Sequence, residues 1–155
     1  MRRTDREVTN FDEIVKIVEK CDICRLALAD DDVPYIIPLN FGFTIENSKL
    51  TLYFHGSDKG KKHELIKKNN HASFEMDCSH QLILSNNSCT CTMNYESVVG
   101  SGIIEYVDNA QKQKALLILM NHYYSNKSYS FNENMLSKTT VFKLTVSKIT
   151  GKRHS

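Results

Sequence analysis

The sequence predicts an α+β fold that is mostly β, a closed antiparallel barrel with accessory helices. Short runs in which apolar and polar residues alternate outnumber the helical patterns, and short turns join these runs. Strands and helices do not alternate regularly along the chain, which argues against a doubly wound sheet. The 155 residues suit a single domain, residues 1–155, because single domains usually hold about 100 to 200 residues.

A helix is expected over residues 10–21. Asn10 can cap its first turn together with Glu13, three residues further on. Apolar residues then recur at helical spacing on one face, where they would pack against the sheet. These residues are Ile14, Ile17, Val18 and Cys21.

Three strands are expected next. The first begins at Cys24, the second covers residues 35–45, and the turn between them is Asp30-Asp31-Asp32. Pro38 lacks the N–H donor of a regular ladder, so the second strand should be an edge, bulged or facing a ligand at that point. The third strand covers residues 50–55, with a core face of period two. That face consists of Leu50, Leu52 and Phe54.

The second half of the chain is expected to contain further strands and helices, whose bounds are indicated by glycines and by helix-capping residues. Gly100 and Gly102 interrupt a long β-rich run, which indicates a bend or close backbone packing. Asp108, with Gln111 three residues later, can start a helix. The final GKRHS is expected to be a basic tail. The expected elements are a helix over 58–68, a strand over 72–76, strand and loop over 77–92, a strand over 97–107, a helix over 108–124 and a strand over 139–149.

Charge and hydropathy exclude several classes of function. The formal net charge is only +2, so a broad nucleic-acid-binding surface is not indicated. No apolar run approaches the ~20 residues that cross a bilayer, so no membrane association is expected. The start, MRRTDREVTN, has no hydrophobic stretch after its arginines, which is not the pattern of a secretory signal. We therefore expect a cytoplasmic protein.

The cysteines are odd in number, five, and are expected to be reduced thiols. Cys21 and Cys24 have CxxC spacing, and Cys89 and Cys91 form a CxC pair far downstream. Four thiolates could bind zinc, but structural zinc sites usually show two well-spaced CxxC-type pairs. A thioredoxin-like redox role is a second alternative. We favour buried or half-buried free thiols.

A strand and a helix are joined by the stretch GSDKGKK, residues 56–62. It is one residue shorter than a P-loop, and Lys62 replaces the hydroxyl that would hold magnesium, so nucleotide hydrolysis is not favoured. Backbone N–H groups and the dipole of the following helix favour an anion, to which Lys61 and Lys62 can add charge-assisted hydrogen bonds. Two interpretations remain: a phosphate site that needs no metal, and a solvated lysine-rich turn.

A neighbouring strand favours the phosphate site. Its segment PLNFGF, residues 38–43, offers an amide, two aromatic rings and a glycine, and the proline interrupts regular pairing. Such a strand leaves backbone groups free for a flat heteroaromatic ring. A ring site beside a phosphate site is typical of a phosphorylated planar cofactor.

Five segments make the chain resemble a known family: PYIIPLNFGF, LTLYFHGSDKGKKHELI, FEMD, YESVVGSG and ITGKR. In this order, and over nearly the whole chain, they are similar to the pyridoxamine 5'-phosphate oxidase-like FMN-binding split-barrel family, and most of all to its 5-nitroimidazole resistance subgroup. The resemblance implies a six-stranded antiparallel split β-barrel. It also implies a homodimer with two FMN sites between the subunits, and an FMN-dependent oxidoreductase that acts on 5-nitroimidazoles or a related small molecule.

The resemblance also implies roles for individual residues. The strand 38–41 would run along the isoalloxazine ring and ribityl chain, and Lys61 and Lys62 would hold the phosphate. His55 would lie beside the flavin and protonate the reduced nitro product, since an imidazole titrates near neutral pH; its alternative role is a hydrogen bond to a loop carbonyl. The implied cofactor-binding residues are Pro38, Leu39, Asn40, Phe41, Tyr53, Phe54, His55, Lys61 and Lys62, with Tyr95 and Ser97 from the segment where the family often brings in the partner subunit.

Other members of the family set the alternatives. Pyridoxamine-phosphate oxidases proper use C-terminal arginine and histidine residues to hold the substrate phosphate. Arg153 and His154 resemble these residues only weakly and are expected to lie in a solvated tail. Vitamin B6 oxidation is therefore not favoured. FAD, a deazaflavin coenzyme or haem could replace FMN, and a flavin-binding sensor without turnover would have the same sequence. The remaining histidines expected at the surface are His63, His71, His80 and His122.

Overall fold

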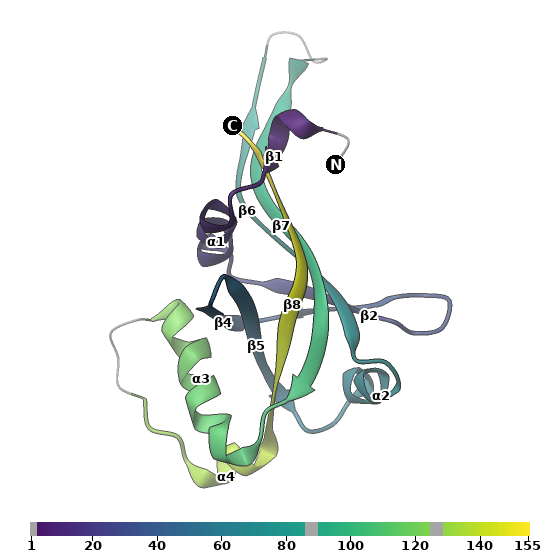
Figure 1. Ribbon diagram of the computed structural model, residues 1–155, viewed down its shortest axis with the longest axis vertical. Helices are drawn as coiled ribbons and strands as arrows, with labels where there is room; N and C mark the ends of the chain where they lie inside the picture. Colours follow the sequence, from purple (N-terminus) through teal and green to yellow (C-terminus); the bar gives the residue numbers. More distant parts are fainter. Residues whose placement is uncertain (1–2, 86–89, 125–128) are drawn as a thin grey trace.

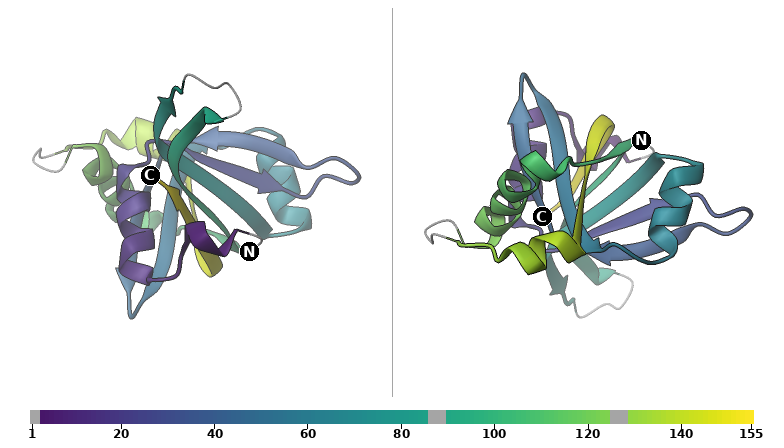
Figure 2. Two further views of the ribbon diagram at one scale, coloured as in Figure 1. Left: turned by 90° about the horizontal axis from the view of Figure 1, so that it is seen from above. Right: turned by 90° about the horizontal axis from the view of Figure 1, so that it is seen from below.

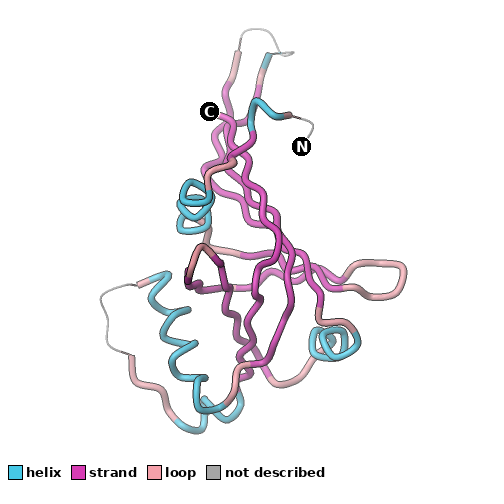
Figure 3. Tube along the Cα trace, viewed as in Figure 1, coloured by secondary structure: helices cyan, strands magenta, loops and turns pink. Residues whose placement is uncertain are grey.

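One antiparallel sheet is the centre of the computed structural model, which describes residues 3–85, 90–124 and 129–155 (Figure 1, Figure 3). The strands follow the order β3-β2-β6-β7-β8-β5-β4, and β1 pairs with β8. The predicted class is confirmed, although the described residues form eight strands where six were expected. The bounds are β1 (Glu7–Val8), β2 (Cys24–Leu28), β3 (Tyr35–Leu39), β4 (Phe41–Glu46), β5 (Lys49–Ser57), β6 (His71–Ile83), β7 (Thr92–Tyr106) and β8 (Thr139–His154).

The two ends of the sheet are joined through a single residue. β3 and β4 lie at opposite ends of the strand order, yet only Asn40 separates them in the sequence. Before Asn40 the chain pairs with β2, and after it with β5, where Phe41 lies opposite Phe54. The single strand expected over residues 35–45 is therefore wrong, because the chain changes partner there. Pro38 lies on β3, an end strand of the sheet, which was one of its expected positions.

Apolar side chains fill the inside of the barrel. Along β5 the side chains of Leu50, Leu52 and Phe54 are buried, which confirms the predicted alternation. Phe54 stacks on Phe142 of β8, with ring centroids 5.4 Å apart. The fully buried phenylalanines among the described residues are Phe41, Phe54, Phe74 and Phe142.

Helices lie outside the sheet, with α1 and α3 on one side and α2 on the other (Figure 2). Asn10 Oδ1 accepts the Glu13 N–H at 3.1 Å, which confirms the predicted cap of α1. In the described parts of the chain, no helix has the length and apolar character needed to span a membrane. The bounds are α1 (Phe11–Lys20), α2 (Lys61–Lys68), α3 (Asn109–Tyr123) and α4 (Glu133–Lys138), of which α4 was not predicted.

The end of the chain is a strand and not a tail. The last strand was expected to end at Ile149 and GKRHS to be a solvated tail, and both predictions are wrong because β8 continues to His154. Gly151 is paired with one residue of β7 and one of β1. A Cβ at Gly151 would lie 2.9 Å from Ile14 Cγ1 of α1. Backbone pairing on both sides therefore holds a segment whose composition is polar.

Replacing Gly42 by alanine is expected to lower the free energy of unfolding by about 2 to 3 kcal/mol. A Cβ at Gly42 of β4 would lie 2.4 Å from Leu119 Cα and 2.6 Å from the Ile118 carbonyl oxygen of α3. Because these are backbone atoms, the helix must move away from the strand. Urea unfolding measures the change. Gly56→Ala is the control, since a Cβ there approaches only the flexible end of Lys62, at 3.2 Å; equal losses in both variants would contradict the argument.

Candidate functional site

A tight turn joins the end of β5 to the start of α2. β5 ends at Ser57 and α2 begins at Lys61, later than the predicted start at residue 58. Gly60 has a φ of +121°, which favours glycine, and no side chain of the described residues caps the helix N-terminus. The Lys59 N–H donates to Ser57 Oγ at 3.3 Å. The uncapped first turn of α2 therefore suits an anion.

Lys61 and Lys62 point to different sides of this turn. Lys61 Nζ lies 2.5 Å from Asp30 Oδ2 and 5.4 Å from the centre of the Tyr35 ring. The hydrogen bond with Asp30 raises the pKa of Lys61 above its ordinary value. Lys62 Nζ donates to the Lys59 carbonyl at 3.3 Å. An anion at the turn would meet Lys62 directly and would compete with Asp30 for Lys61.

The two segments expected to hold a ring, residues 38–41 and 53–55, are neighbours in the barrel. β4 pairs with β5 so that Phe41 lies opposite Phe54, and both rings are fully buried. These two residues can therefore reach a ligand only through backbone atoms. Tyr53 packs against a buried cluster between α3 and β8 that consists of Ala115, Leu116 and Val141. Pro38, Asn40 and His55 are exposed, and Leu39 and Tyr53 are half-buried.

His55 borders an apolar pocket of about 270 Å³ between the end of β5, α3 and α4. Desolvation lowers the pKa of this imidazole below its ordinary value. At neutral pH the ring is therefore in its neutral form, and it becomes protonated only in more acidic solution. The apolar residues of the pocket are Leu116, Leu119, Met120, Phe131, Met135 and Leu136.

Tyr95 and Ser97 lie apart from the turn. Both belong to the first part of β7, which descends from the hairpin arm at the top of Figure 1, whereas α2 is near the bottom. The Tyr95 ring lies 5.5 Å from Lys152 Nζ, and Ser97 is paired with Asp77 on one side and Lys152 on the other. Within one chain the structure pairs the predicted ring segments on β4 and β5 and places Lys61 beside Asp30 and Tyr35, whereas Tyr95 and Ser97 lie on another part of the sheet.

His63 is buried, so the prediction of a surface position is wrong. Its Nε2 lies 2.7 Å from the Ser57 carbonyl oxygen, and its Nδ1 lies 2.8 Å from the Tyr106 hydroxyl. The ring therefore lies directly behind the turn that carries the two lysines. His63 precedes Ile66, which is also buried, by three residues. This helical spacing is the signal in the sequence that places His63 on the buried face of α2.

His122 is also placed differently from its expected surface position. It lies on α3, with Nε2 2.8 Å from the Cys21 carbonyl oxygen and its ring 4.5 Å from that of Phe41. His71 and His80 are exposed, as predicted. His122 thus helps to attach α3 to the barrel.

The hydroxyl of Tyr123 ties the strand change at Asn40 to α3. It accepts the Phe41 N–H at 3.0 Å and a hydrogen bond from Asn40 Nδ2 at 3.2 Å, and it donates to the Asp22 carbonyl at 2.6 Å. Nothing in the sequence of α3 itself indicates these distant partners of Tyr123.

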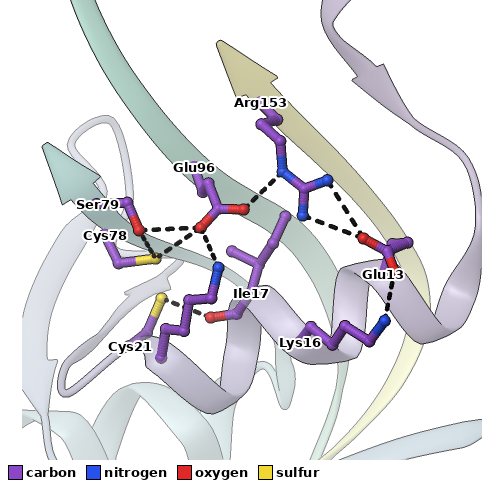
Figure 4. Close-up of polar contacts among 9 residues, drawn as sticks. Glu13, Lys16, Ile17, Cys21, Cys78, Ser79, Glu96 and Arg153 are labelled. Atoms are coloured by element: carbon purple, nitrogen blue, oxygen red, sulfur yellow. Dashed lines mark hydrogen bonds and ion pairs between the residues drawn. The ribbon is translucent and has the colours of Figure 1, made fainter. Parts of the chain in front are cut away.

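An ionic network around a buried carboxylate joins α1 to the long strands (Figure 4). Glu96 is 7% exposed and accepts hydrogen bonds from Lys20 and Arg153 at 2.6 Å each and from Ser79 at 2.9 Å. Arg153 also binds Glu13 at 3.2 Å. Burial opposes the charge of Glu96, but the hydrogen bonds outweigh it and lower the pKa of the carboxyl. Since both of its oxygens are engaged, Glu96 stabilises the fold and is not placed to act as a catalytic acid.

The CxxC cysteines are internal. Cys21 and Cys24 are free and buried, and burial raises the pKa of both thiols, so they stay protonated. This placement agrees with buried free thiols. Cys91 is exposed, and Cys89 lies outside the described residues.

The strand order, the link at Asn40 and the flanking helices define a split β-barrel protein. Residues 10–153 match the family model described as Pyridoxamine 5'-phosphate oxidase. The chain belongs to this family. A comparison with curated protein sequences gives no match.

Solved structures share the fold. A Bacteroides thetaiotaomicron protein named as a candidate 5-nitroimidazole antibiotic resistance protein is 29% identical at a TM-score of 0.82, and the match covers 95% of this chain and 86% of that one. An FAD and haem binding protein from Mycobacterium smegmatis is 16% identical at a TM-score of 0.85, covering 97% and 74%. A flavocytochrome from Azotobacter vinelandii is 16% identical at a TM-score of 0.82, covering 100% and 72%. The last two are similar in fold alone.

Proposed function

We propose that this protein is a flavin-dependent oxidoreductase that uses FMN to reduce 5-nitroimidazoles or a related small molecule. The observation that carries the proposal is the likeness, at 29% identity over 95% of the chain, to a protein named for 5-nitroimidazole resistance. The names of the two more distant structures, an FAD and haem binding protein and a flavocytochrome, add support for a flavin.

The donors around the turn fit the phosphate of FMN. The first turn of α2 has no side-chain cap, and Lys62 lies over the turn. A phosphate there would accept backbone N–H groups and charge-assisted hydrogen bonds. Pro38 and Asn40 are exposed, so the flat ring would contact them from solvent. A bound flavin supplies the electron transfer, and the chain holds and orients it.

We propose further that two copies of the chain complete each site. Tyr95 and Ser97 lie apart from the turn within one chain, so they would serve the site of a second copy. The outer face of the sheet suits such a contact, because exposed apolar side chains surround small ones there. The apolar ones are Ile36, Val99 and Ile103, at 62%, 50% and 42% exposed, and the small ones are Ala27, Ser73 and Ser101, which lie in register.

The proposal is tested with purified protein that is mixed separately with FMN and FAD and then desalted. We expect an oxidised-flavin absorption spectrum after FMN, about one flavin per chain, and the mass of a dimer by light scattering. The flavin is then reduced without oxygen and mixed with a 5-nitroimidazole. Reoxidation with loss of the nitro absorbance supports the oxidoreductase. Flavin that stays reduced indicates a sensor, and protein that retains no flavin overturns the cofactor assignment.

His55→Ala is expected to leave FMN bound and to slow nitro reduction by about 100-fold, the usual contribution of a general acid. Because the pKa of His55 is lowered, its protonated form increases only below about pH 6.5. The rate of the unaltered protein should therefore rise toward acid pH, and the variant should lose this rise. Stopped-flow reoxidation of the reduced flavin measures both. His71→Ala, at an exposed histidine, is the control; an unchanged pH profile in His55→Ala would exclude His55 as the proton donor.

A further inference from the structure

The turn between β5 and α2 is held from behind by a buried histidine. His63 is 8% exposed, and both of its ring nitrogens have partners: the Ser57 carbonyl at 2.7 Å and the Tyr106 hydroxyl at 2.8 Å. The ring also lies edge-on to Phe142, with centroids 6.4 Å apart. Ser57 is the last residue of β5, and Tyr106 is the last residue of β7.

The partners determine where the imidazole proton is. A carbonyl oxygen only accepts, so Nε2 carries the hydrogen that is donated to Ser57. Nδ1 of the neutral ring is then an acceptor and receives the Tyr106 O–H. Because both nitrogens are used in one defined tautomer, the ring orientation is fixed.

His63 therefore connects the start of α2 to the strands on which the turn depends. Its own N–H closes the turn by donating to the Gly60 carbonyl at 3.1 Å. Its side chain fixes the residue where the turn leaves β5. The other side-chain contacts within the turn are exposed: Ser57 Oγ accepts from the Lys59 N–H and donates to Asp58 Oδ1, at 3.3 Å each, and Lys62 donates to the Lys59 carbonyl at 3.3 Å.

We propose that His63 is a positioning residue that gives the site its preference for a phosphorylated flavin over the same flavin without phosphate. The inference rests on the proposed function, in which the turn receives the FMN phosphate. A turn that is already ordered binds an anion more tightly, because binding then carries no entropic cost of ordering the turn. Riboflavin has the same ring and ribityl chain but no phosphate, so its binding does not depend on the turn.

The test measures the affinity of FMN and of riboflavin for the unaltered protein and for three variants. His63→Leu keeps a buried apolar group and removes both hydrogen bonds, and we expect FMN affinity to fall about tenfold while riboflavin affinity changes less than about twofold. Tyr106→Phe removes one hydrogen bond, and we expect a loss of about threefold for FMN only. His63→Gln can still donate to Ser57 and should restore most of the FMN affinity.

Lys67→Gln, at an exposed position of α2, is the matched control and should keep the ratio of the two affinities. Far-ultraviolet circular dichroism and the unfolding temperature of each variant show whether it is folded. If His63→Leu does not fold, Tyr106→Phe still decides the question, because only a positioning role predicts a loss of FMN affinity without a loss of riboflavin affinity.

The outcomes separate the inference from the function on which it rests. Loss of FMN preference in His63→Leu, with recovery in His63→Gln, supports the positioning role. Equal loss of FMN and riboflavin, or no loss of either, overturns it while leaving the flavin assignment intact. If the unaltered protein binds neither flavin, both the proposed function and the positioning role are wrong.

Discussion

Replacing Glu96 by alanine is expected to lower the free energy of unfolding by about 2 to 3 kcal/mol. Glu96 is the buried acceptor for Lys20, Arg153 and Ser79. Removing one partner of a buried ion pair usually costs about 3 to 5 kcal/mol, and we reduce this range because the Lys20 side chain is 52% exposed. Urea unfolding at neutral pH measures the loss.

Glu105→Ala is the matched control for this variant. The carboxylate of Glu105 is 57% exposed and lies 3.5 Å from Lys143. A surface ion pair of this kind contributes at most about 1 kcal/mol. If the two variants lose the same stability, the buried network does not stabilise the fold as described.

Lowering the pH should remove the stabilisation that Glu96 provides to the folded state. The pKa of Glu96 is lowered in the folded protein from its ordinary value of 4.5. A lowered pKa means that the folded state binds the proton less readily, so the stabilisation is complete above about pH 4.5 and is lost as the pH falls through the folded value. The difference in stability between the unaltered protein and Glu96→Gln should be constant from pH 6 to 8 and shrink below about pH 4.5. A difference that grows toward acid pH would contradict this assignment.

Replacing Lys61 and Lys62 together by alanine is expected to weaken FMN binding by at least about tenfold, since each charge-assisted hydrogen bond contributes about 1.5 to 3 kcal/mol. Lys62 should account for the larger part, because Lys61 is already bound to Asp30 at 2.5 Å. Fluorescence titration with FMN measures the double and the two single variants. Riboflavin affinity should change little.

The pair Lys67→Ala and Lys68→Ala is the control for this experiment. It removes the same charge from the same helix, but from the last turn of α2, where the helix dipole does not favour an anion. Unchanged FMN affinity in the Lys61 and Lys62 variant would exclude the turn as the phosphate site. Equal losses in the two double variants would indicate a general effect of charge.

Features that depend on a few adjacent residues were predictable. The Asn10 cap of α1 and the alternation of Leu50, Leu52 and Phe54 follow from local geometry and agree with the structure. The turn at residues 56–62 could also be located, because its glycines indicate a turn and its lysines supply the positive charge. Each of these signals lies within one strand or one helical turn.

Local patterns along the chain thus identify the class of fold, most of the helices and strands, and the position of the lysine-bearing turn. They do not identify the change of strand partner at Asn40, the pairing of residues 151–154 or the burial of His63, because each of these depends on groups that are distant in the sequence. Arg153 binds Glu96 across a sequence separation of 57 residues, and His63 contacts Tyr106 across a separation of 43 residues. Only the folded sheet brings such groups together, and no local pattern indicates them.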